Sequence, residues 1–304
     1  GEVMGGRLWH PCAAASGVWV RGSFHGHCRE SSRCATVPLA AGVAEYRRLG
    51  AAFIAVTDHD RVTDLAALRQ EYPDIIFLEG FEYSTRENMA FVGEQVPPLY
   101  ELPLEEALCR AGDAIVTIAC HPRPHAAGPE YWSLEKLSEL GTWPDGIEVY
   151  NGHYGTEVAL SHGRQPLGTH LWDEALTAGR RLWGYANDDF HDPEDLGNAW
   201  NMVHVEATAG ATSVTAAALV QAAKAGRCYG TTGLLLRGFE VEGERLSIEL
   251  AAPAQGAFIG PGGRALCRGE GTRFEYRHQG EPHVRFEAEG GAGRIFLQPA
   301  FAGG

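Results

Sequence analysis

The sequence predicts an α/β protein in which a seven- or eight-stranded β/α barrel precedes a small antiparallel β module. Up to about residue 235, apolar runs of strand length alternate with segments of helical periodicity, as repeated β-α units with a parallel sheet require. Six of these runs end in a polar cluster on their C-terminal side, which is where a β/α barrel assembles its active site. Residues 237–304 have no helical period and many glycines. An open doubly wound sheet is the alternative to the barrel.

The first half of the predicted barrel is defined by one strand and one helix with clear signals. Residues 51–57 (AAFIAVT) form a nearly continuous apolar run, which is typical of a strand buried on both faces of a parallel sheet. Leu39, Val43 and Tyr46 recur at helical spacing, and Gly50 is a natural residue to end that helix. The other strands expected here are residues 18–25, 75–78, 89–92 and 114–120, with helices near 65–68 and at 104–111.

The second half continues the alternation and then changes character. Strands are expected at 147–150, 182–186 and 202–205, and helices at 134–140, 167–178 and 214–225. In the module, residues 239–242 and 246–250 alternate around Gly243-Glu244, which predicts a hairpin. Further strands are expected at 274–276, 284–286 and 295–297. The predicted domains are an N-terminal extension (1–17), the barrel (18–236) and the β module (237–304).

Composition limits the possible partners. The net charge of −14 argues against a nucleic-acid or anionic-membrane surface, because both partners need a basic face. No apolar run reaches the roughly 18 residues that span a bilayer. Seven Cys with no C-x-x-C do not form a disulfide framework, and reduced thiols fit the cytoplasm. We therefore expect a cytoplasmic protein that acts on a small molecule; its oligomeric state stays open.

Side chains that commonly bind metal ions follow one predicted strand after another along the chain. His25 and His27 lie at i and i+2 and therefore point to the same side of a strand. Nitrogen and carboxylate donors suit a divalent transition ion such as Zn, Mn or Fe, and eight of them exceed what one tetrahedral ion needs. The predicted ligands are His25, His27, Asp58, His59, Glu82, His121, Asp189 and His191. One to three ions are expected. Cys28 touches the first motif and is interpreted as a core thiol in preference to a ligand.

These motifs carry a family resemblance across residues 18–235. The order His25-Gly26-His27, Thr57-Asp58-His59, Gly80-Phe81-Glu82, His121-Pro122 and Asp189-Phe190-His191 resembles the polymerase and histidinol phosphatase (PHP) family of metal-dependent hydrolases. The resemblance implies a distorted (β/α)7 barrel, two or three Mn, Fe or Zn ions, and phosphoester hydrolysis as the usual chemistry. The added β tail looks more like the branch that includes aryl-carbamate hydrolases, and residues 296–300 resemble the closing strand of that branch.

The chain departs from the family pattern in two places. The family usually has an acidic or His ligand about five residues after the second His, where this chain has residues 28–33 (CRESSR); Glu30 is the possible substitute. The family also usually has a His ahead of the strand at 89–93, where Asn88 stands here. Both differences fall on the second and third metal positions, so the sequence favours one or two ions over three.

The expected chemistry is hydrolysis by metal-activated water. Glu82 is placed to bridge two ions. His59 and His121 are candidate general acids if they hold no metal, and Asp189 or His191 could pass a proton. The candidate substrate-binding residues are Arg29, Asn88, Arg123, His125, Asn151 and Asp188, with Asp188 also able to orient a ligand. Tyr131, Trp132, Tyr150 and Tyr154 follow the same strand ends and could floor a pocket or form the rim of the core.

The predicted function is a phosphoesterase acting on a small soluble phosphate ester. The first alternative is a hydrolase of a non-phosphate bond, such as an aryl ester, carbamate or amide, which the aromatic residues and the missing family ligands favour. The second alternative is a non-catalytic binding protein with a degenerate metal site.

Overall fold

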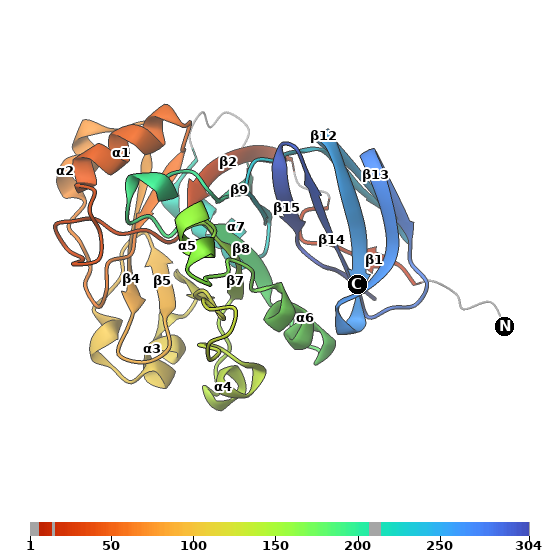
Figure 1. The fold of residues 1–304 in the computed structure, drawn as a ribbon, viewed down its shortest axis with the longest axis horizontal. Helices are drawn as coiled ribbons and strands as arrows, with labels where there is room; N and C mark the ends of the chain where they lie inside the picture. Colours follow the sequence, from red (N-terminus) through yellow and green to blue (C-terminus); the bar gives the residue numbers. More distant parts are fainter. Residues whose placement is uncertain (1–5, 14–15, 207–213, 304) are drawn as a thin grey trace.

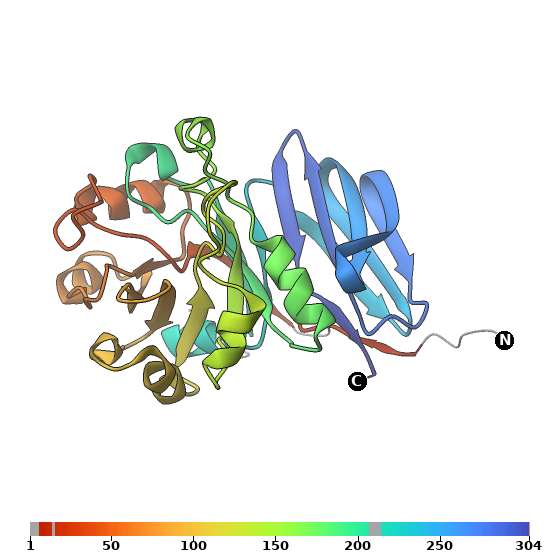
Figure 2. The same ribbon diagram turned by 60° about the horizontal axis from the view of Figure 1, so that its bottom comes forward.

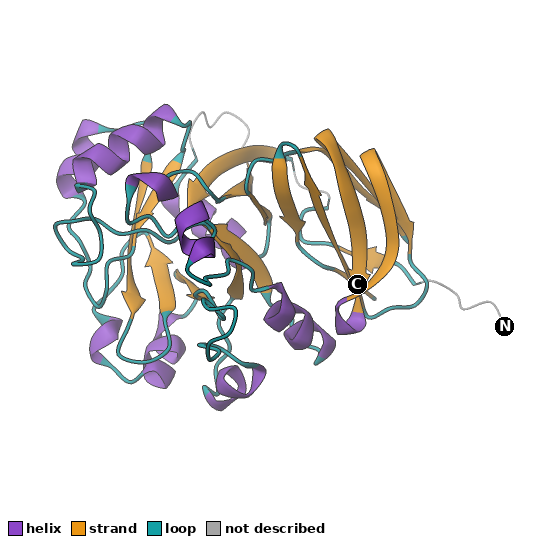
Figure 3. Cartoon of the chain, viewed as in Figure 1, coloured by secondary structure: helices purple, strands orange, loops and turns teal. Residues whose placement is uncertain are grey.

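A computed structural model describes residues 6–13, 16–206 and 214–303, so residues 1–5 and 14–15 of the predicted N-terminal extension lie outside it. The chain forms two adjoining lobes, one of strands covered by helices and one almost entirely of strands (Figures 1 and 3). This arrangement confirms the predicted α/β class with a C-terminal antiparallel region. None of the described helices is long and apolar enough to cross a bilayer.

The first lobe is a curved sheet surrounded by short helices. Its strands are β2 (Gly17–Ser23), β3 (Phe53–Val56), β4 (Ile76–Tyr83), β5 (Met89–Gly93), β6 (Ile115–Ala119), β7 (Gly146–Asn151), β8 (Trp183–Asn187), β9 (Trp200–Glu206) and β10 (Cys228–Thr231). Its helices are α1 (Leu39–Arg48), α2 (Ala66–Glu71), η1 (Leu99–Glu101), α3 (Leu104–Ala111), α4 (Leu134–Glu139), α5 (Glu157–Ser161), α6 (Thr169–Thr177), η2 (Pro193–Asp195) and α7 (Ala216–Lys224). The sequence did not indicate α5 or β10.

Strand pairing in this lobe is mixed. β2, β3 and β4 pair in parallel, as do β6, β7 and β8. β5 is antiparallel to both of its neighbours, and β9 and β10 extend the sheet beyond β2 with antiparallel pairing. In the described residues no backbone ladder joins β8 to β9 or β10, so the predicted closed barrel is not confirmed.

Two side-chain amides occupy the edge of β8 where a closing strand would lie. Asn201 of β9 accepts the backbone N–H of Ala186 at 3.0 Å and donates to its carbonyl at 2.7 Å. Gln298, directly after β15, accepts the N–H of Gly184 at 2.8 Å and donates to its carbonyl at 2.7 Å. A carboxamide carries the same donor and acceptor as a peptide group, so these two side chains satisfy the buried edge of β8 without a ladder.

The second lobe is a set of antiparallel strands that a short strand from near the start of the chain joins (Figure 2). It contains β11 (Leu236–Glu242), β12 (Arg245–Gly260), η3 (Pro261–Gly263), β13 (Arg264–Arg277), β14 (His283–Gly290), β15 (Gly293–Leu297) and β16 (Ala300–Ala302), and β1 (Leu8–Trp9) pairs with β16. The predicted hairpin at Gly243 is confirmed by the pairing of Glu242 with Arg245. β12 and β13 are longer than expected, at 16 and 14 residues.

A buried ion pair joins the two lobes. Arg285 of β14 donates to both carboxylate oxygens of Asp173 on α6, at 2.7 and 2.9 Å, and is only 2% exposed. Its guanidinium also lies 5.0 Å from the ring centre of Trp172. Breaking one side of such a pair leaves an uncompensated buried charge, so the contact fixes the second lobe against α6.

Replacing Gln298 with Leu should lower the free energy of unfolding by about 2–5 kcal/mol, because the N–H and the carbonyl of Gly184 lose their partners. Urea unfolding followed by circular dichroism measures the change. The matched control is Gln279→Leu at an exposed position, which should stay within about 0.5 kcal/mol of wild type. Equal stability of the two variants would contradict the edge-closing role of Gln298.

Candidate metal centre

The strand ends of the first lobe bring most of the predicted ligands together. His25 and His27 follow β2, His59 follows β3, Glu82 lies near the end of β4, and Asp189 follows β8. The remaining predicted ligands are His121, which follows β6, and Asp58 and His191 beside their neighbours. Parallel strands end at one side of a sheet, and therefore residues far apart in the sequence meet there.

Four of these side chains form one buried cluster. The donor atoms of His25, His27, Glu82 and Asp189 all lie within 4.8 Å of one another. Asp189 Oδ1 lies 3.0 Å from Nε2 of both histidines. Glu82 Oε1 lies 3.3 Å from His25 Nε2 and 3.2 Å from His27 Nε2. Ligands about 2.1 Å from one ion are about 3.0 Å apart at a right angle and about 3.4 Å apart at a tetrahedral angle, which matches this spacing.

An unpaired nitrogen supports the fit to a metal. His25 is fully buried, and its Nε2 has no hydrogen-bond partner among the described residues although two carboxylates adjoin it. An unsatisfied buried polar atom is costly. The other ring nitrogen, Nδ1, contacts Glu148 at 2.8 Å, which leaves Nε2 free to bind an ion. The residues present therefore fit a divalent metal.

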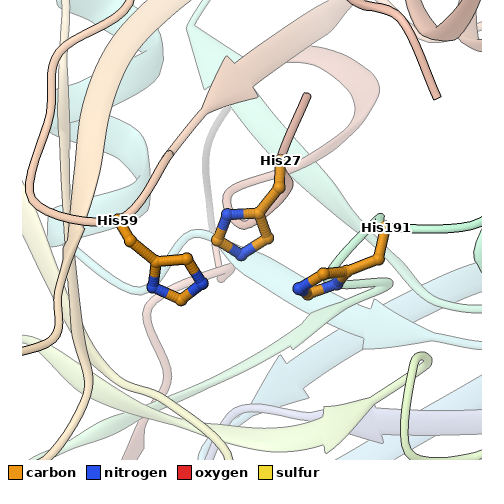
Figure 4. A group of neighbouring side chains, drawn as sticks. All are labelled: His27, His59 and His191. Atoms are coloured by element: carbon orange, nitrogen blue, oxygen red, sulfur yellow. The ribbon is translucent and has the colours of Figure 1, made fainter. Parts of the chain in front are cut away.

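Three more imidazoles surround this cluster. His121 Nε2 lies 3.2 Å from Glu82 Oε2, the oxygen that does not face His27. His59 and His191 lie on either side of His27, with ring centres 4.5 and 4.3 Å away (Figure 4). Glu82 thus faces histidines with both oxygens, which is the arrangement that a bridging carboxylate needs.

Protonation compensates the buried carboxylates in the absence of a metal. Burial lowers the pKa of His27, but the hydrogen bonds and charges of Asp189 and Glu82 outweigh this effect and raise the pKa to about 9. Burial raises the pKa of Glu82, yet the His25 charge and the histidine hydrogen bonds bring it well below its usual range. The pKa of Asp189 is lowered in the same way, against burial, by His25, His191 and His27.

A second layer of buried polar residues holds the ligands. Glu148 of β7 contacts His25 Nδ1 and accepts hydrogen bonds from the His121 backbone at 2.9 Å and from Asn187 at 2.9 Å. Asn151 donates to Glu148 at 2.6 Å and to Asp189 Oδ2 at 3.0 Å. The sequence prediction placed Asn151 at the substrate and missed Glu148, although a charged residue within an apolar strand was a usable signal.

Backbone strain coincides with the ligands. His121 and Asp189 both have positive φ, at 24° and 50°, and so does Asp60 at 46°. These are the three described non-glycine residues with positive φ. Such conformations cost free energy and are concentrated at functional sites, where the surrounding structure enforces them.

Asp58 and Glu30 are not brought into the metal cluster. The Asp58 carboxylate accepts hydrogen bonds from the Cys28 backbone at 3.0 Å, from Ser32 at 2.6 Å and from Thr63 at 2.6 Å. Glu30 is exposed and accepts the backbone N–H of Leu39, at the start of α1, at 3.0 Å. Asp58 therefore orients the loop around the ligands, and Glu30 caps a helix.

The other predicted substrate-binding residues are scattered. Arg29 is exposed, and Arg123 lies 4.0 Å from Glu130 with 40% of its side chain exposed. Asn88 donates to Ser84 at 3.4 Å, and Ser84 contacts His59 Nδ1 at 2.6 Å.

His125 Nε2 lies 3.2 Å from Arg164. Asp188 is fully buried and accepts from Tyr46 at 2.5 Å, and burial raises its pKa to about 7.

A cavity of about 930 Å³ lies beside the ligands. His153 lines it, and its ring stacks on His191 with centres 4.3 Å apart. Tyr154 also lines it and meets the His121 ring edge-on at 5.2 Å, while Arg164 lies 5.2 Å from the ring centre of Tyr154. His153, Tyr154 and Arg164 thus connect the cavity to the cluster; of these, only Tyr154 was predicted. His153 and Arg164 lie in a stretch without a recognisable motif.

The fold of this chain is similar to that of a solved two-domain protein. The chain is similar to a two-domain protein from Bacteroides vulgatus that contains a predicted PHP-like metal-dependent phosphoesterase, with a TM-score of 0.54 and 16% identity over 93% of each chain. An amidohydrolase from Chromobacterium violaceum, solved with bound sulfate and no metal, aligns with a TM-score of 0.41 and 16% identity over 58% of this chain and 89% of its own.

The first likeness shows that both lobes share the fold of the two-domain PHP-like protein, in agreement with the resemblance of the motifs. By sequence, no protein-family model matches this chain. No curated protein matches it either.

Glu148→Gln should weaken metal binding about 10–100-fold, because the neutral amide no longer holds the His25 ring as a carboxylate does. Competition with a chromophoric chelator measures the affinity. Glu139→Gln, at an exposed position on α4, serves as the control and should bind as wild type does. Unchanged metal affinity in Glu148→Gln would contradict the conclusion that Glu148 orients the His25 ring.

Metal affinity should also increase with pH. Since the pKa of His27 is about 9 without metal, an entering ion must displace a proton at neutral pH. The apparent Mn²⁺ affinity should therefore rise about tenfold per pH unit between about pH 6.5 and 8.5 for each proton displaced. Titration calorimetry in buffers of different ionisation enthalpy counts the protons. A flat profile without proton release would contradict this assignment.

Proposed function

We propose that this protein is a metal-dependent hydrolase, and specifically a phosphoesterase that acts on a small phosphate ester. The observation that carries the proposal is the buried cluster of His25, His27, Glu82 and Asp189, with an unpaired His25 nitrogen, next to a large cavity. A buried concentration of carboxylates and imidazoles without a cation is poorly explained by stability alone.

The chain would hold a first ion with these four side chains. Glu82 presents its other oxygen to His121, so the same carboxylate would join a second position. When bound, a divalent ion supplies Lewis acidity and lowers the pKa of water towards about 7. In this arrangement Asp189 and His121 serve as ligands, which leaves His59 as the candidate general acid among the predicted residues.

Residues of the cavity wall would hold the substrate and a proton. His153 Nδ1 contacts the Asp195 carboxylate at 2.7 Å, which fixes the ring. Burial lowers the pKa of His153, but the Asp195 hydrogen bond and nearby carboxylates outweigh this effect and raise it. The raised pKa favours the protonated form of this ring, which lies between the cavity and His191. This places it as a further candidate donor to a leaving group.

Arg164 favours an anionic substrate. It lines the cavity, and no carboxylate lies within 4.0 Å of its guanidinium in the described part of the chain. A guanidinium without a carboxylate partner is suited to bind a phosphate oxygen pair. Arg164 thus takes the role that the sequence prediction gave to Arg29 and Arg123, both of which lie outside the lining of this cavity.

Hydrolysis of a non-phosphate ester, carbamate or amide is the second candidate. Four carboxylates line the same cavity, and they would repel a doubly charged phosphate monoester. They are Glu157, Asp192, Glu194 and Asp195. Tyr150 and Tyr154 on the cavity wall also offer aromatic surface to an aryl group.

Activity should depend on metal and on the cluster. The protein stripped by a chelator and reloaded with Mn²⁺ or Zn²⁺ should hydrolyse a generic aryl phosphate, and Asp189→Asn should reduce kcat/KM at least about 100-fold because a charged ligand is lost. Asp113→Asn, at an exposed position, is the matched control.

Parallel assays with an aryl ester distinguish the two substrate classes. Hydrolysis of the ester alone would mean that the substrate is a non-phosphate ester, carbamate or amide. Turnover of neither compound by metal-loaded protein would instead support the non-catalytic binding protein.

A further inference from the structure

Arg164 is held in the wall of the cavity by neutral side chains. Its Nη1 lies 3.2 Å from His125 Nε2, and its guanidinium lies 5.2 Å from the ring centre of Tyr154. Among the described residues, no carboxylate forms an ion pair with Arg164. The guanidinium therefore keeps an uncompensated positive charge at the wall of a cavity that is otherwise lined by several carboxylates.

The contact between His125 and Arg164 has only one possible polarity. An arginine side chain has N–H donors and no acceptor, so His125 Nε2 accepts the hydrogen bond and its ring is neutral, with the proton on Nδ1. A carboxylate in the same place would also hold the arginine, but it would cancel the charge that attracts an anion. A neutral acceptor orients the side chain without this loss.

One edge of the guanidinium stays available to a ligand. The hydrogen bond to His125 uses Nη1, and the Arg164 side chain makes no other hydrogen bond to the described residues. The N–H groups of Nε and Nη2 form a planar fork that matches two oxygens of a phosphate or a carboxylate. Tyr154 attracts the cation through its ring and uses none of these donors.

The backbone sets the distance between the two side chains. His125 and Arg164 face each other in an antiparallel bridge that joins the loop after β6 to the loop after α5. Next to this bridge, Ala126 donates its N–H to the Gly163 carbonyl at 2.9 Å. The hydrogen bond between the side chains therefore extends a backbone contact that the fold already makes.

The loop that carries His125 begins at one of the predicted metal ligands. His121 precedes His125 by four residues, and prolines occupy positions 122 and 124 between them. Proline fixes φ at about −65°, so this short segment has few conformations. The position of His125 relative to the cluster is therefore restricted, and through His125 the position of Arg164 is restricted as well.

We propose that His125 is a positioning residue that acts through Arg164. It holds the guanidinium, with its charge uncompensated, as the receptor for the anionic part of the substrate. His125 thus contributes to substrate binding without touching the substrate itself. The inference rests on the proposed function for the identity of the substrate, whereas anion binding by Arg164 can be measured without hydrolysis.

Paired substitutions of His125 test this role. His125→Leu removes the acceptor and should raise KM for an aryl phosphate about tenfold with kcat within about twofold of wild type, because binding is lost equally in the ground state and the transition state. His125→Gln should keep KM within about threefold of wild type, since its side-chain oxygen can take the place of Nε2. His170→Leu, on α6 and outside the lining of this cavity, is the matched control.

A shorter polar side chain provides a second loss variant. His125→Asn carries the same amide as His125→Gln, but it is too short to reach Arg164, and it should raise KM as His125→Leu does. The comparison of Asn with Gln remains decisive even if His125→Leu does not fold. An unchanged KM in His125→Asn, or an equal KM in the Asn and Gln variants, would overturn the proposal.

A double-mutant cycle distinguishes positioning from an independent effect of His125. Arg164→Gln should raise KM at least as much as His125→Leu does. Adding His125→Leu to Arg164→Gln should then change KM by less than about twofold, because the two residues act as one unit. A full effect of His125→Leu in the Arg164→Gln background would show that His125 does not act through Arg164.

Titration of the metal-free protein with inorganic phosphate separates this inference from the proposed function. Calorimetry should show that phosphate affinity falls at least about fivefold in His125→Leu and in Arg164→Gln, because a charge-assisted hydrogen bond is weakened or lost. Such a fall without hydrolysis of any aryl phosphate or ester would reject the proposed function and retain the anion receptor. Hydrolysis of an aryl phosphate with a KM and a phosphate affinity that His125→Leu leaves unchanged would reject the positioning role alone.

Discussion

Two carboxylates, Glu82 and Asp189, are buried against the same pair of imidazoles, and the arrangement of the strand ends depends on compensating their charge. Both are at most 1% exposed, so solvent cannot stabilise them, and isolated buried charges are too costly to persist. The two carboxylates raise the pKa values of His25 and His27 against the effect of burial, so protons on these rings supply the compensating positive charge when no metal is bound. A divalent ion can supply the same charge at the same place and release those protons.

The second lobe contacts the strand that leads to Asp189. β8 delivers this residue, and in the described structure one edge of β8 is satisfied by side chains instead of a strand. One of these side chains, Gln298, belongs to the second lobe and holds Gly184, while Asn201 holds Ala186. The geometry of a ligand in the first lobe is therefore set partly by a residue more than 100 positions later. Through Gln298, the second lobe thus satisfies part of the edge of the strand that leads to Asp189.

The sequence predicted what depends on local pattern and strand order. Apolar runs located the strands, and the residues after them include the side chains of the buried cluster, because parallel strands end at the same side of a sheet whether or not the sheet closes into a barrel. It could not show which carboxylates face the cluster: Asp58 follows a strand as Asp189 does, yet protein donors occupy it. Arg164 reaches the cavity from a loop outside every motif, and long-range contacts of this kind leave no periodic signal. Glu148 was detectable in principle, since a charge within an apolar strand requires a buried partner.

The loop at residues 28–37 shows how the start of a helix can engage a carboxylate that the sequence suggested as a ligand. α1 begins after Pro38, which offers no side-chain cap for the unpaired N–H groups of the first turn. Glu30 supplies that cap by accepting the Leu39 N–H, and a carboxylate near a helix N-terminus is further stabilised by the helix dipole. A carboxylate that accepts this N–H is held at the start of the helix, and Glu30 belongs to none of the groups of closely spaced donors in the described residues. With Glu30 committed to α1, this loop contributes no carboxylate to the cluster that the strand ends form.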